Sequence, residues 1–194
     1  GIPVNDISMR FYRPPETREQ LGGALAGYGL VEILDRPAGA GYVVISPFTR
    51  WSSKNWPLEN FIELAAALAG EYSVLITGTE GDRGAITSQL SGDMPGVYNL
   101  AGELNLAQLA ELMSGARLVI SGDSFPMHLA AAVQVPLVAL FGPTDERKTG
   151  PRTQHSHVLR PDDCAMCDKP ECRRACLEQI PVSRVAQAAL GLLQ

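Results

Sequence analysis

Five short, mostly apolar runs alternate with stretches of helical periodicity through the middle of the chain. The runs span residues 42–46, 73–77, 97–100, 118–121 and 137–141. A run that is apolar at successive positions is typical of a strand covered on both faces. Strands that alternate with helices form a parallel sheet through right-handed crossovers. The sequence therefore predicts an α/β fold, a doubly wound parallel sheet with helices on both of its faces.

Helices are expected between these runs because apolar residues recur there three or four positions apart. One helix is expected to have Pro57 at its start and Gly70 at its end, and another to have Asn105 as its N-cap and Gly115 as its stop. Residues 7–12 alternate in a way that predicts a short strand. The predicted helices cover residues 16–30, 58–68, 82–91, 106–113, 125–133 and 182–193.

The composition suits one soluble domain with a sizeable core. The chain has 194 residues, of which 45% are apolar and 19% are charged. No apolar run approaches the ~20 residues that span a bilayer, so no transmembrane segment is expected. The net charge of −5, with scattered Lys and Arg, argues against nucleic acid as a partner. We expect residues 1–41 to be a lead-in segment and residues 42–194 to be the ligand-binding domain.

Polar side chains follow the predicted strands at the points where those strands end. Ligands of open α/β sheets bind outside the carboxyl ends of the strands. The loops there are expected at residues 47–56, 78–82, 101–105, 122–128 and 142–149. The polar candidate binding residues that these loops bring to one edge are Thr49, Ser52, Ser53, Lys54, Glu80, Asp82, Asp123, Ser124, His128 and Thr144.

These residue types suit a ligand that carries phosphate. Lys54 supplies a positive charge, and the backbone N–H groups after Ser124 supply neutral donors at a helix N-terminus. Glu80 can accept hydrogen bonds from ribose hydroxyls. No G-x-G-x-x-G follows a strand, and no Walker A or G-x-S-x-G sequence is present. A dinucleotide redox enzyme, a P-loop NTPase and a hydrolase with a nucleophile elbow are therefore disfavoured.

Each candidate also has a plainer interpretation. Asp123 or Ser124 can cap the helix that follows instead of touching a ligand. His128 can be a partly buried histidine whose hydrogen bonds are satisfied within the protein. Lys54, near Trp51 and Trp56, can be a surface lysine that extends its stem along apolar side chains. The gathering of so many polar residues at one edge favours a binding site.

The four cysteines lie close together near the C-terminus. Cys164, Cys167, Cys172 and Cys176 fall within a loop expected at residues 161–178. Four thiolates in so short a loop suit a structural zinc or mononuclear iron ion, whereas disulfides or reduced structural thiols are the alternatives. A secreted disulfide protein usually spreads its cysteines more widely.

Several motifs together resemble one known family. Residues 121–150 contain Asp-Ser-x-x-Met-His-Leu-Ala-Ala-Ala and Leu-Phe-Gly-Pro-Thr-Asp. This stretch closely resembles the C-terminal domain of bacterial ADP-heptose:lipopolysaccharide heptosyltransferases, glycosyltransferase family 9. The Lys-Asn-Trp-Pro sequence at 54–57 and the Leu-Ala-Gly sequence at 100–102 agree with it. The cysteine loop resembles the heptosyltransferase II branch, and the resemblance covers about residues 42–194.

The resemblance implies one Rossmann-like half of a GT-B enzyme, the half that binds the nucleotide-sugar donor. It implies inverting transfer of heptose from ADP-heptose to a lipopolysaccharide-type acceptor, without a catalytic metal, in the cytoplasm or peripheral to the inner membrane. By analogy, Lys54 and Thr49 hold the diphosphate and Glu80 or Asp82 binds the nucleoside. Asp123, Ser124 and His128 then line the diphosphate and sugar, with Thr144 nearby, and Lys54 stabilises the leaving diphosphate.

The chain departs from the family pattern in two respects. Phe125 stands where the family usually has glycine, so it is expected to narrow the pocket or to stack on a base or sugar. The family's second domain, which binds the acceptor and carries the catalytic aspartate, has no counterpart in residues 1–41. The alternatives are another GT-B enzyme that uses a nucleotide sugar, such as a UDP-sugar transferase or an epimerase, and a nucleotide-binding module without catalysis.

Overall fold

The protein folds around a sheet in which every strand runs parallel to its neighbours. The computed structural model describes residues 11–35, 41–90, 94–170 and 176–194, and within these ranges six strands pair in the order β3-β2-β1-β4-β5-β6. This is the strand order of doubly wound nucleotide-binding folds, so the predicted fold class is confirmed. The strands are β1 (Tyr42–Ser46), β2 (Ser73–Ile76), β3 (Val97–Asn99), β4 (Leu118–Gly122), β5 (Leu137–Leu140) and β6 (Ser156–Leu159).

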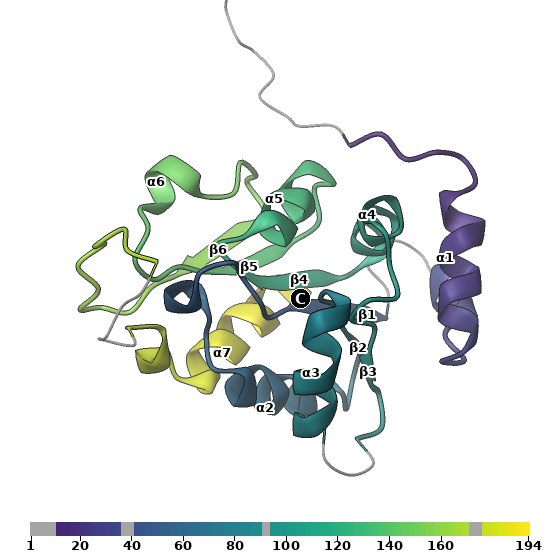
Figure 1. Cartoon of the computed structure of the whole chain (residues 1–194), viewed down its shortest axis with the longest axis horizontal. Coiled ribbons are helices and arrows are strands. Elements are labelled where there is room, and N and C mark those ends of the chain that lie inside the picture. The colour runs from purple at the N-terminus through teal and green to yellow at the C-terminus, as the bar shows by residue number, and fades with distance from the viewer. Residues whose placement is uncertain (1–10, 36–40, 91–93, 171–175) are drawn as a thin grey trace, which may run out of the picture.

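Helices cover both faces of the sheet (Figure 1). The α-helices are α1 (Thr17–Ala26), α2 (Leu58–Leu68), α3 (Arg83–Gln89), α4 (Leu106–Gly115), α5 (Phe125–Ala132), α6 (Glu146–Thr149) and α7 (Val182–Leu193). Four 3-10 turns complete the described part of the chain: η1 (Val31–Asp35), η2 (Ser52–Lys54), η3 (Glu80–Asp82) and η4 (Cys176–Gln179). Because successive strand residues point to opposite faces, Val43 and Ile45 pack under α2 and α7 while Val44 packs under α4 and α5.

Local signals place most helix ends where the sequence predicts them. Asn105 is the N-cap of α4, where its side chain accepts from the Gln108 N–H and its own N–H donates to Gln108 Oε1. Pro57 precedes the first residue of α2, and its fixed φ suits that position. α7 occupies the predicted residues 182–193.

Three elements differ from the predictions. The helix predicted at 16–30 ends at Ala26, since the glycines that follow favour a turn. Residues 142–149, predicted as a loop, contain the short helix α6, which Asp145 caps by accepting from the Arg147 N–H. β6 has no apolar run to signal it, because it is an edge strand with only Leu159 fully buried.

The segment before β1 contributes to the core. Leu21 and Leu25 of α1 are fully buried beside α4, so part of the predicted lead-in segment packs on the domain. The division at residue 41 stays a prediction, and the strand predicted at 7–12 lies mostly outside the described residues. No helix found in the described ranges has the length and apolar character needed to cross a membrane.

Candidate functional site

Two neighbouring cavities lie at the carboxyl edge of the sheet. The more apolar one has a volume of about 480 Å³ and lies among the loops after β2 and β3 and the starts of α4 and α5. The more polar one has a volume of about 670 Å³ and lies between the loop after β1 and the start of α5. Phe48, Thr79, Asp82, Phe125 and Pro126 line both cavities, so the two form one continuous cleft.

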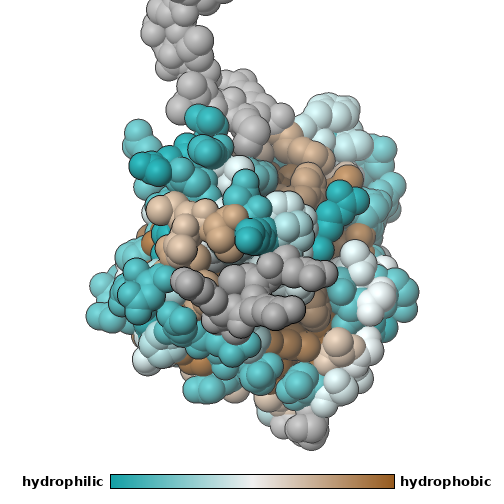
Figure 2. Space-filling view, turned by 60° about the vertical axis from the view of Figure 1, so that its left-hand side comes forward, coloured by the Kyte–Doolittle hydropathy of each residue, from teal (hydrophilic) through white to brown (hydrophobic). Residues whose placement is uncertain are grey.

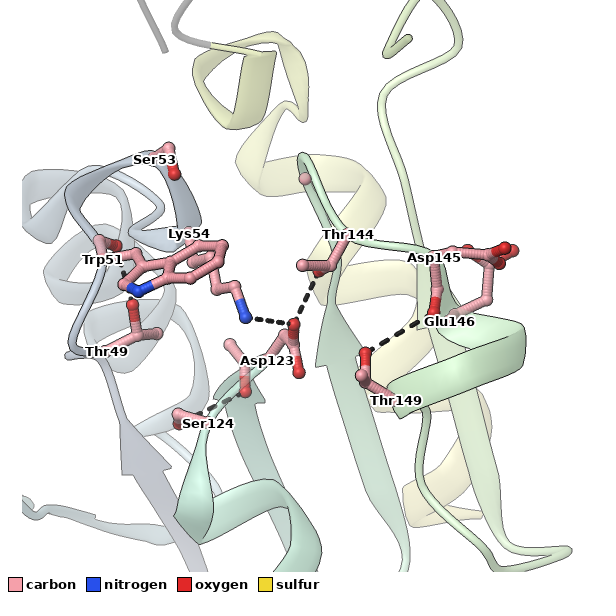
Figure 3. Close-up of polar contacts among 12 residues, drawn as sticks. Thr49, Trp51, Ser53, Lys54, Asp123, Ser124, Thr144, Asp145, Glu146 and Thr149 are labelled. Atoms are coloured by element: carbon pink, nitrogen blue, oxygen red, sulfur yellow. Dashed lines mark hydrogen bonds and ion pairs between the residues drawn. The ribbon is translucent and has the colours of Figure 1, made fainter. Parts of the chain in front are cut away.

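A buried carboxylate is the centre of the polar cavity. Asp123 lies at the end of β4, and its Oδ2 accepts from Lys54 Nζ at 2.7 Å and from the Thr144 hydroxyl at 2.6 Å. Figure 3 shows Lys54 reaching it from the loop after β1 and Thr144 from the loop after β5. The side chains of Asp123 and Lys54 are only 3% and 15% exposed, so the charges are largely withdrawn from water. Three segments distant in sequence therefore meet at one carboxylate, as the strand-end argument predicts.

The contacts of Asp123 and Ser124 bear on their alternative role as helix caps. Ser124 holds the N-cap position of α5, but its side chain makes no capping hydrogen bond, and the Asp123 carboxylate is engaged by Lys54 and Thr144. Pro126 follows in the first turn and has no N–H, and the Met127 N–H bonds to the Ser124 carbonyl. The start of α5 therefore offers fewer free N–H donors to an anion than a helix N-terminus usually does, and Lys54 is the cation of the polar centre.

The loop that carries Lys54 approaches β4 closely because β4 ends in a glycine. A Cβ at Gly122 would lie 2.9 Å from Thr49 Cγ2 and 3.1 Å from the Lys54 carbonyl oxygen. The loop is folded by Asn55, whose Oδ1 accepts from the Thr49 N–H, while the Thr49 hydroxyl donates to the Trp51 carbonyl. Lys54 Nζ also lies 4.5 Å from the centre of the Trp51 ring, a cation–π distance.

Glu80 lies at the rim of the apolar cavity with most of its side chain in solvent. The side chain is 75% exposed, and Oε2 accepts from Arg83 Nε at 3.3 Å. Arg83 also donates to Glu103 at 2.5 Å. The Tyr28 hydroxyl, then the Glu103 and Glu80 carboxylates, raise the pKa of Arg83 above its ordinary value, so this guanidinium stays charged. Glu80 is thus oriented by a neighbour but remains accessible to a ligand.

Asp82 and Phe125 lie where the two cavities join. Asp82 Oδ2 accepts from both the N–H and the hydroxyl of Thr79 at 2.7 Å, which closes the turn after β2. One oxygen of Asp82 is therefore bonded within its own loop, as one oxygen of Glu80 is bonded to Arg83. Phe125 is 48% exposed and lines both cavities, so it can contact a ligand in either one.

His128 is half-buried on α5 and lines neither cavity. No side-chain hydrogen bond or ion pair links it to another residue of the described ranges. Asp145 also lines neither cavity, and Arg147 binds its carboxylate through two nitrogens and lowers its pKa to about 2. The last residue of the Gly-Pro-Thr-Asp sequence is therefore a cap of α6, whereas Thr144 is the residue that contacts the site.

Two arginines of the site do not emerge from sequence reasoning. Arg50 is exposed and lines the polar cavity. The sequence signal that could have found it is its place beside the candidate Thr49 in the loop after β1. Arg160 follows β6, and its guanidinium donates to the Thr144 carbonyl at 2.6 Å and to the Gly142 carbonyl at 2.9 Å. No sequence pattern indicates Arg160, because the strand that places it was itself not predicted.

The cysteines are only partly described. Cys164 is half-buried, Cys167 is exposed and Cys176 is buried, while Cys172 lies outside the described residues. Among the residues that the structure describes, no group of three or more His, Cys, Asp or Glu side chains is placed to hold a metal ion. The Cys164 thiol instead donates to the Gly142 carbonyl at 3.0 Å.

Comparison with known proteins identifies the family of this site. The model of glycosyltransferase family 9 (heptosyltransferase) matches residues 15–178, which include both cavities. The chain belongs to glycosyltransferase family 9. The matched range also includes α1, so the family pattern begins before the predicted boundary at residue 42.

Relatives within family 9 are longer than this chain. Lipopolysaccharide heptosyltransferase 2 of Salmonella typhimurium is 36% identical over 113 residues, which cover 56% of this chain and 32% of that protein. A family 9 structure from Veillonella parvula superposes with a TM-score of 0.82 at 24% identity, over 98% of this chain and 55% of that one. The E. coli heptosyltransferase WaaC with ADP superposes with a TM-score of 0.66 at 26% identity, over 80% and 46%. The chain thus spans about a third to about half of the length of these relatives.

Proposed function

We propose that this chain binds the nucleotide-sugar donor of an inverting glycosyltransferase that transfers heptose from ADP-heptose to a lipopolysaccharide-type acceptor. The observation that carries the proposal is the polar centre of Lys54, Asp123 and Thr144 beside an apolar cavity that has Glu80 at its rim. The WaaC structure that superposes on this chain contains ADP, which supports a nucleoside diphosphate as the ligand.

The two cavities suit the two parts of such a donor. The apolar cavity, lined by Leu104, Leu106 and Leu109, suits a base, with the Glu80 carboxylate as acceptor for ribose hydroxyls. The polar cavity suits a diphosphate, with Arg50 and Lys54 as its positive groups. Lys54 then exchanges its contact with Asp123, in whole or in part, for the phosphate oxygens. Asp123, thus released, is placed to accept hydrogen bonds from the sugar.

In the transfer itself, Lys54 and Arg50 act on the leaving diphosphate. Negative charge grows on the bridging oxygen as its bond to the sugar breaks, and fixed cations in a partly dry site stabilise that charge. No divalent metal is assigned a part in this step. We propose that the acceptor site and the catalytic base belong to the part of the enzyme that this chain does not span, and that the enzyme acts in the cytoplasm or peripheral to the inner membrane.

Isothermal titration calorimetry with ADP, ADP-heptose and UDP tests the proposal. We expect ADP and ADP-heptose to bind with one site per chain and UDP to bind more weakly, because a pyrimidine fills less of the apolar cavity. Tighter binding of UDP would favour a different GT-B enzyme. Binding of ADP with no preference for ADP-heptose would favour a nucleotide-binding module in which Phe125 blocks the sugar. No binding of any nucleotide would refute the proposal.

A structural zinc or iron ion at the cysteine loop is a separate proposal. Its support is the chemistry of four thiolates within 13 residues, because the described cysteines do not by themselves form a metal-holding group. We expect metal analysis of the purified protein to give one zinc or iron per chain, and a thiol reagent to react with four cysteines only after chelation. Four thiols that titrate at once in metal-free protein would contradict it.

A further inference from the structure

The segment that follows β6 contacts both loops that carry the polar centre. We call residues 160–170 the strap. Figure 1 shows it after β6, beside the η2 turn of the loop that carries Lys54. Figure 2 brings this side of the molecule forward and shows hydrophilic residues over most of the face, with apolar residues in patches between them. Residues 165–170 of the strap are exposed, whereas Arg160 at its start is half-buried and Pro161 is buried.

The strap is fixed to the loop after β1 by two hydrogen bonds from one residue. The Ser53 N–H donates to the Pro170 carbonyl at 3.3 Å, and the Ser53 hydroxyl donates to the Lys169 carbonyl at 2.7 Å. Ser53 immediately precedes Lys54. The far end of the strap therefore holds the loop position next to the lysine of the polar centre.

The strap is fixed to the loop after β5 by a larger set of bonds. The Asp168 N–H donates to the Pro143 carbonyl at 2.9 Å, and Cys164 donates to the Gly142 carbonyl. Arg160 donates from Nη2 to the Gly142 carbonyl and from Nη1 to the Thr144 carbonyl, and its Nη1 also pairs with Glu146 at 2.6 Å. These bonds fix the backbone carbonyls of residues 142–144, while the Thr144 hydroxyl donates to Asp123.

Backbone strain within the strap suggests that its shape is imposed by these contacts. Met166 and Asp168 have φ values of 46° and 49°, in the left-handed region that residues with a Cβ seldom adopt. Such conformations persist only where surrounding contacts fix them, and they gather at ligand sites. The strained residue Asp168 makes one of the bonds to the loop after β5.

We propose that the strap is a positioning element of the donor site and that Arg160 is its main positioning residue. Lys54 and Thr144 must approach Asp123 from opposite sides, and the strap is bonded to the loops of both. It thereby fixes the gap into which a diphosphate fits before the ligand arrives. Preorganisation of this kind increases affinity because less ordering occurs on binding. The proposal rests on the proposed nucleotide site, but it also makes a prediction for the free protein.

The test compares Arg160→Met with wild type in the 194-residue chain. We expect ADP to bind about 10-fold more weakly, as for loss of a charged hydrogen-bond group acting through its neighbours. In the free protein, we expect faster hydrogen exchange at the Ser53 and Asp168 amides. Arg160→Lys keeps the charge but cannot bridge two carbonyls, so the ADP affinity of this variant should lie between those of wild type and Arg160→Met. Arg184→Met is the matched control, because the Arg184 side chain pairs with Asp162 of the strap and has no hydrogen bond or ion pair to either loop within the described residues.

A double-mutant cycle between Arg160 and Lys54 distinguishes a positioning role of Arg160 from a general effect on the stability of the protein. If Arg160 acts through the polar centre, the losses of ADP affinity in Arg160→Met and Lys54→Met should be less than additive in the double variant. Additive losses, or unchanged amide exchange in Arg160→Met, would overturn the proposal. Should Arg160→Met fail to fold, Ser53→Ala tests the other end of the strap by the same two measurements. If wild type binds no nucleotide, the proposed function fails. The amide exchange of the free protein then still shows whether Arg160 and the strap order the two loops.

Discussion

Lys54→Met is expected to lower the free energy of unfolding by about 3 kcal/mol, because it leaves the Asp123 carboxylate buried without its counter-ion. The Thr144 hydroxyl still donates to that carboxylate, but a neutral donor does not offset the cost of burying a charge. Urea unfolding followed by circular dichroism measures the change. Lys148→Met is the matched control, since Lys148 is exposed on α6, and it should change stability by no more than about 0.5 kcal/mol.

The companion variant Asp123→Asn separates a charge effect from a packing effect. Adding Asp123→Asn to Lys54→Met removes the unpaired charge, while the new amide oxygen still accepts from Thr144. The double variant should therefore be more stable than Lys54→Met alone. A double variant that is less stable would mean that the lysine stem, and not its charge, stabilises the loop.

The Lys54→Met variant should weaken the binding of every diphosphate ligand, whichever nucleotide base the ligand carries. Lys54→Met is expected to weaken ADP, UDP and inorganic pyrophosphate by a similar factor, about 10- to 100-fold, since a charged hydrogen bond to phosphate is lost. Calorimetry with the three ligands gives the comparison. Unchanged affinity for pyrophosphate would remove Lys54 from the diphosphate role.

The strand-end argument succeeded where it relied on topology alone. Lys54, Asp123 and Thr144 lie far apart in sequence, yet a parallel sheet brings all three to one edge, and the structure places them in contact. The helix ends at Pro57 and Asn105 were predictable because their signals are local and chemical. What could not be foreseen is which side chain pairs with which, because that depends on rotamers and loop conformation.

The elements that escaped prediction share a physical cause. β6 is a short edge strand, and edge strands carry polar residues that hide the apolar signal. Arg160 follows that strand, so its role in holding the loop of Thr144 was invisible as well. The family resemblance offers Asp82 as the alternative to Glu80 for the nucleoside, and that assignment stays a prediction. The structure adds that one Asp82 oxygen closes a turn through Thr79, a local contact that the sequence does not indicate.

Gly102→Ala is expected to weaken ADP binding at least about 10-fold, because Gly102 makes room for Glu80. Gly102 has a φ of +80°, and a Cβ there would lie 2.1 Å from Glu80 Oε2 and 2.9 Å from Glu80 Cα. The side chain of Glu80 can rotate away, but its backbone must shift. The left-handed φ adds about 1–3 kcal/mol of strain. The carboxylate predicted to bind ribose is therefore displaced from the rim of the apolar cavity.

The choice of ligand makes this prediction specific to the nucleoside end of the cleft. Pyrophosphate lacks a ribose, so Gly102→Ala should leave its affinity within about two-fold of wild type, whereas Lys54→Met weakens it. Gly84→Ala is the matched control, because a Cβ at Gly84 meets nothing within 4 Å and the residue lies in α3. Alanine there should stabilise the helix by about 0.5–1 kcal/mol and leave ADP binding unchanged. Equal losses for ADP and pyrophosphate in Gly102→Ala would mean that the substitution deforms the whole cleft, and Glu80 would then lose its assignment to the ribose.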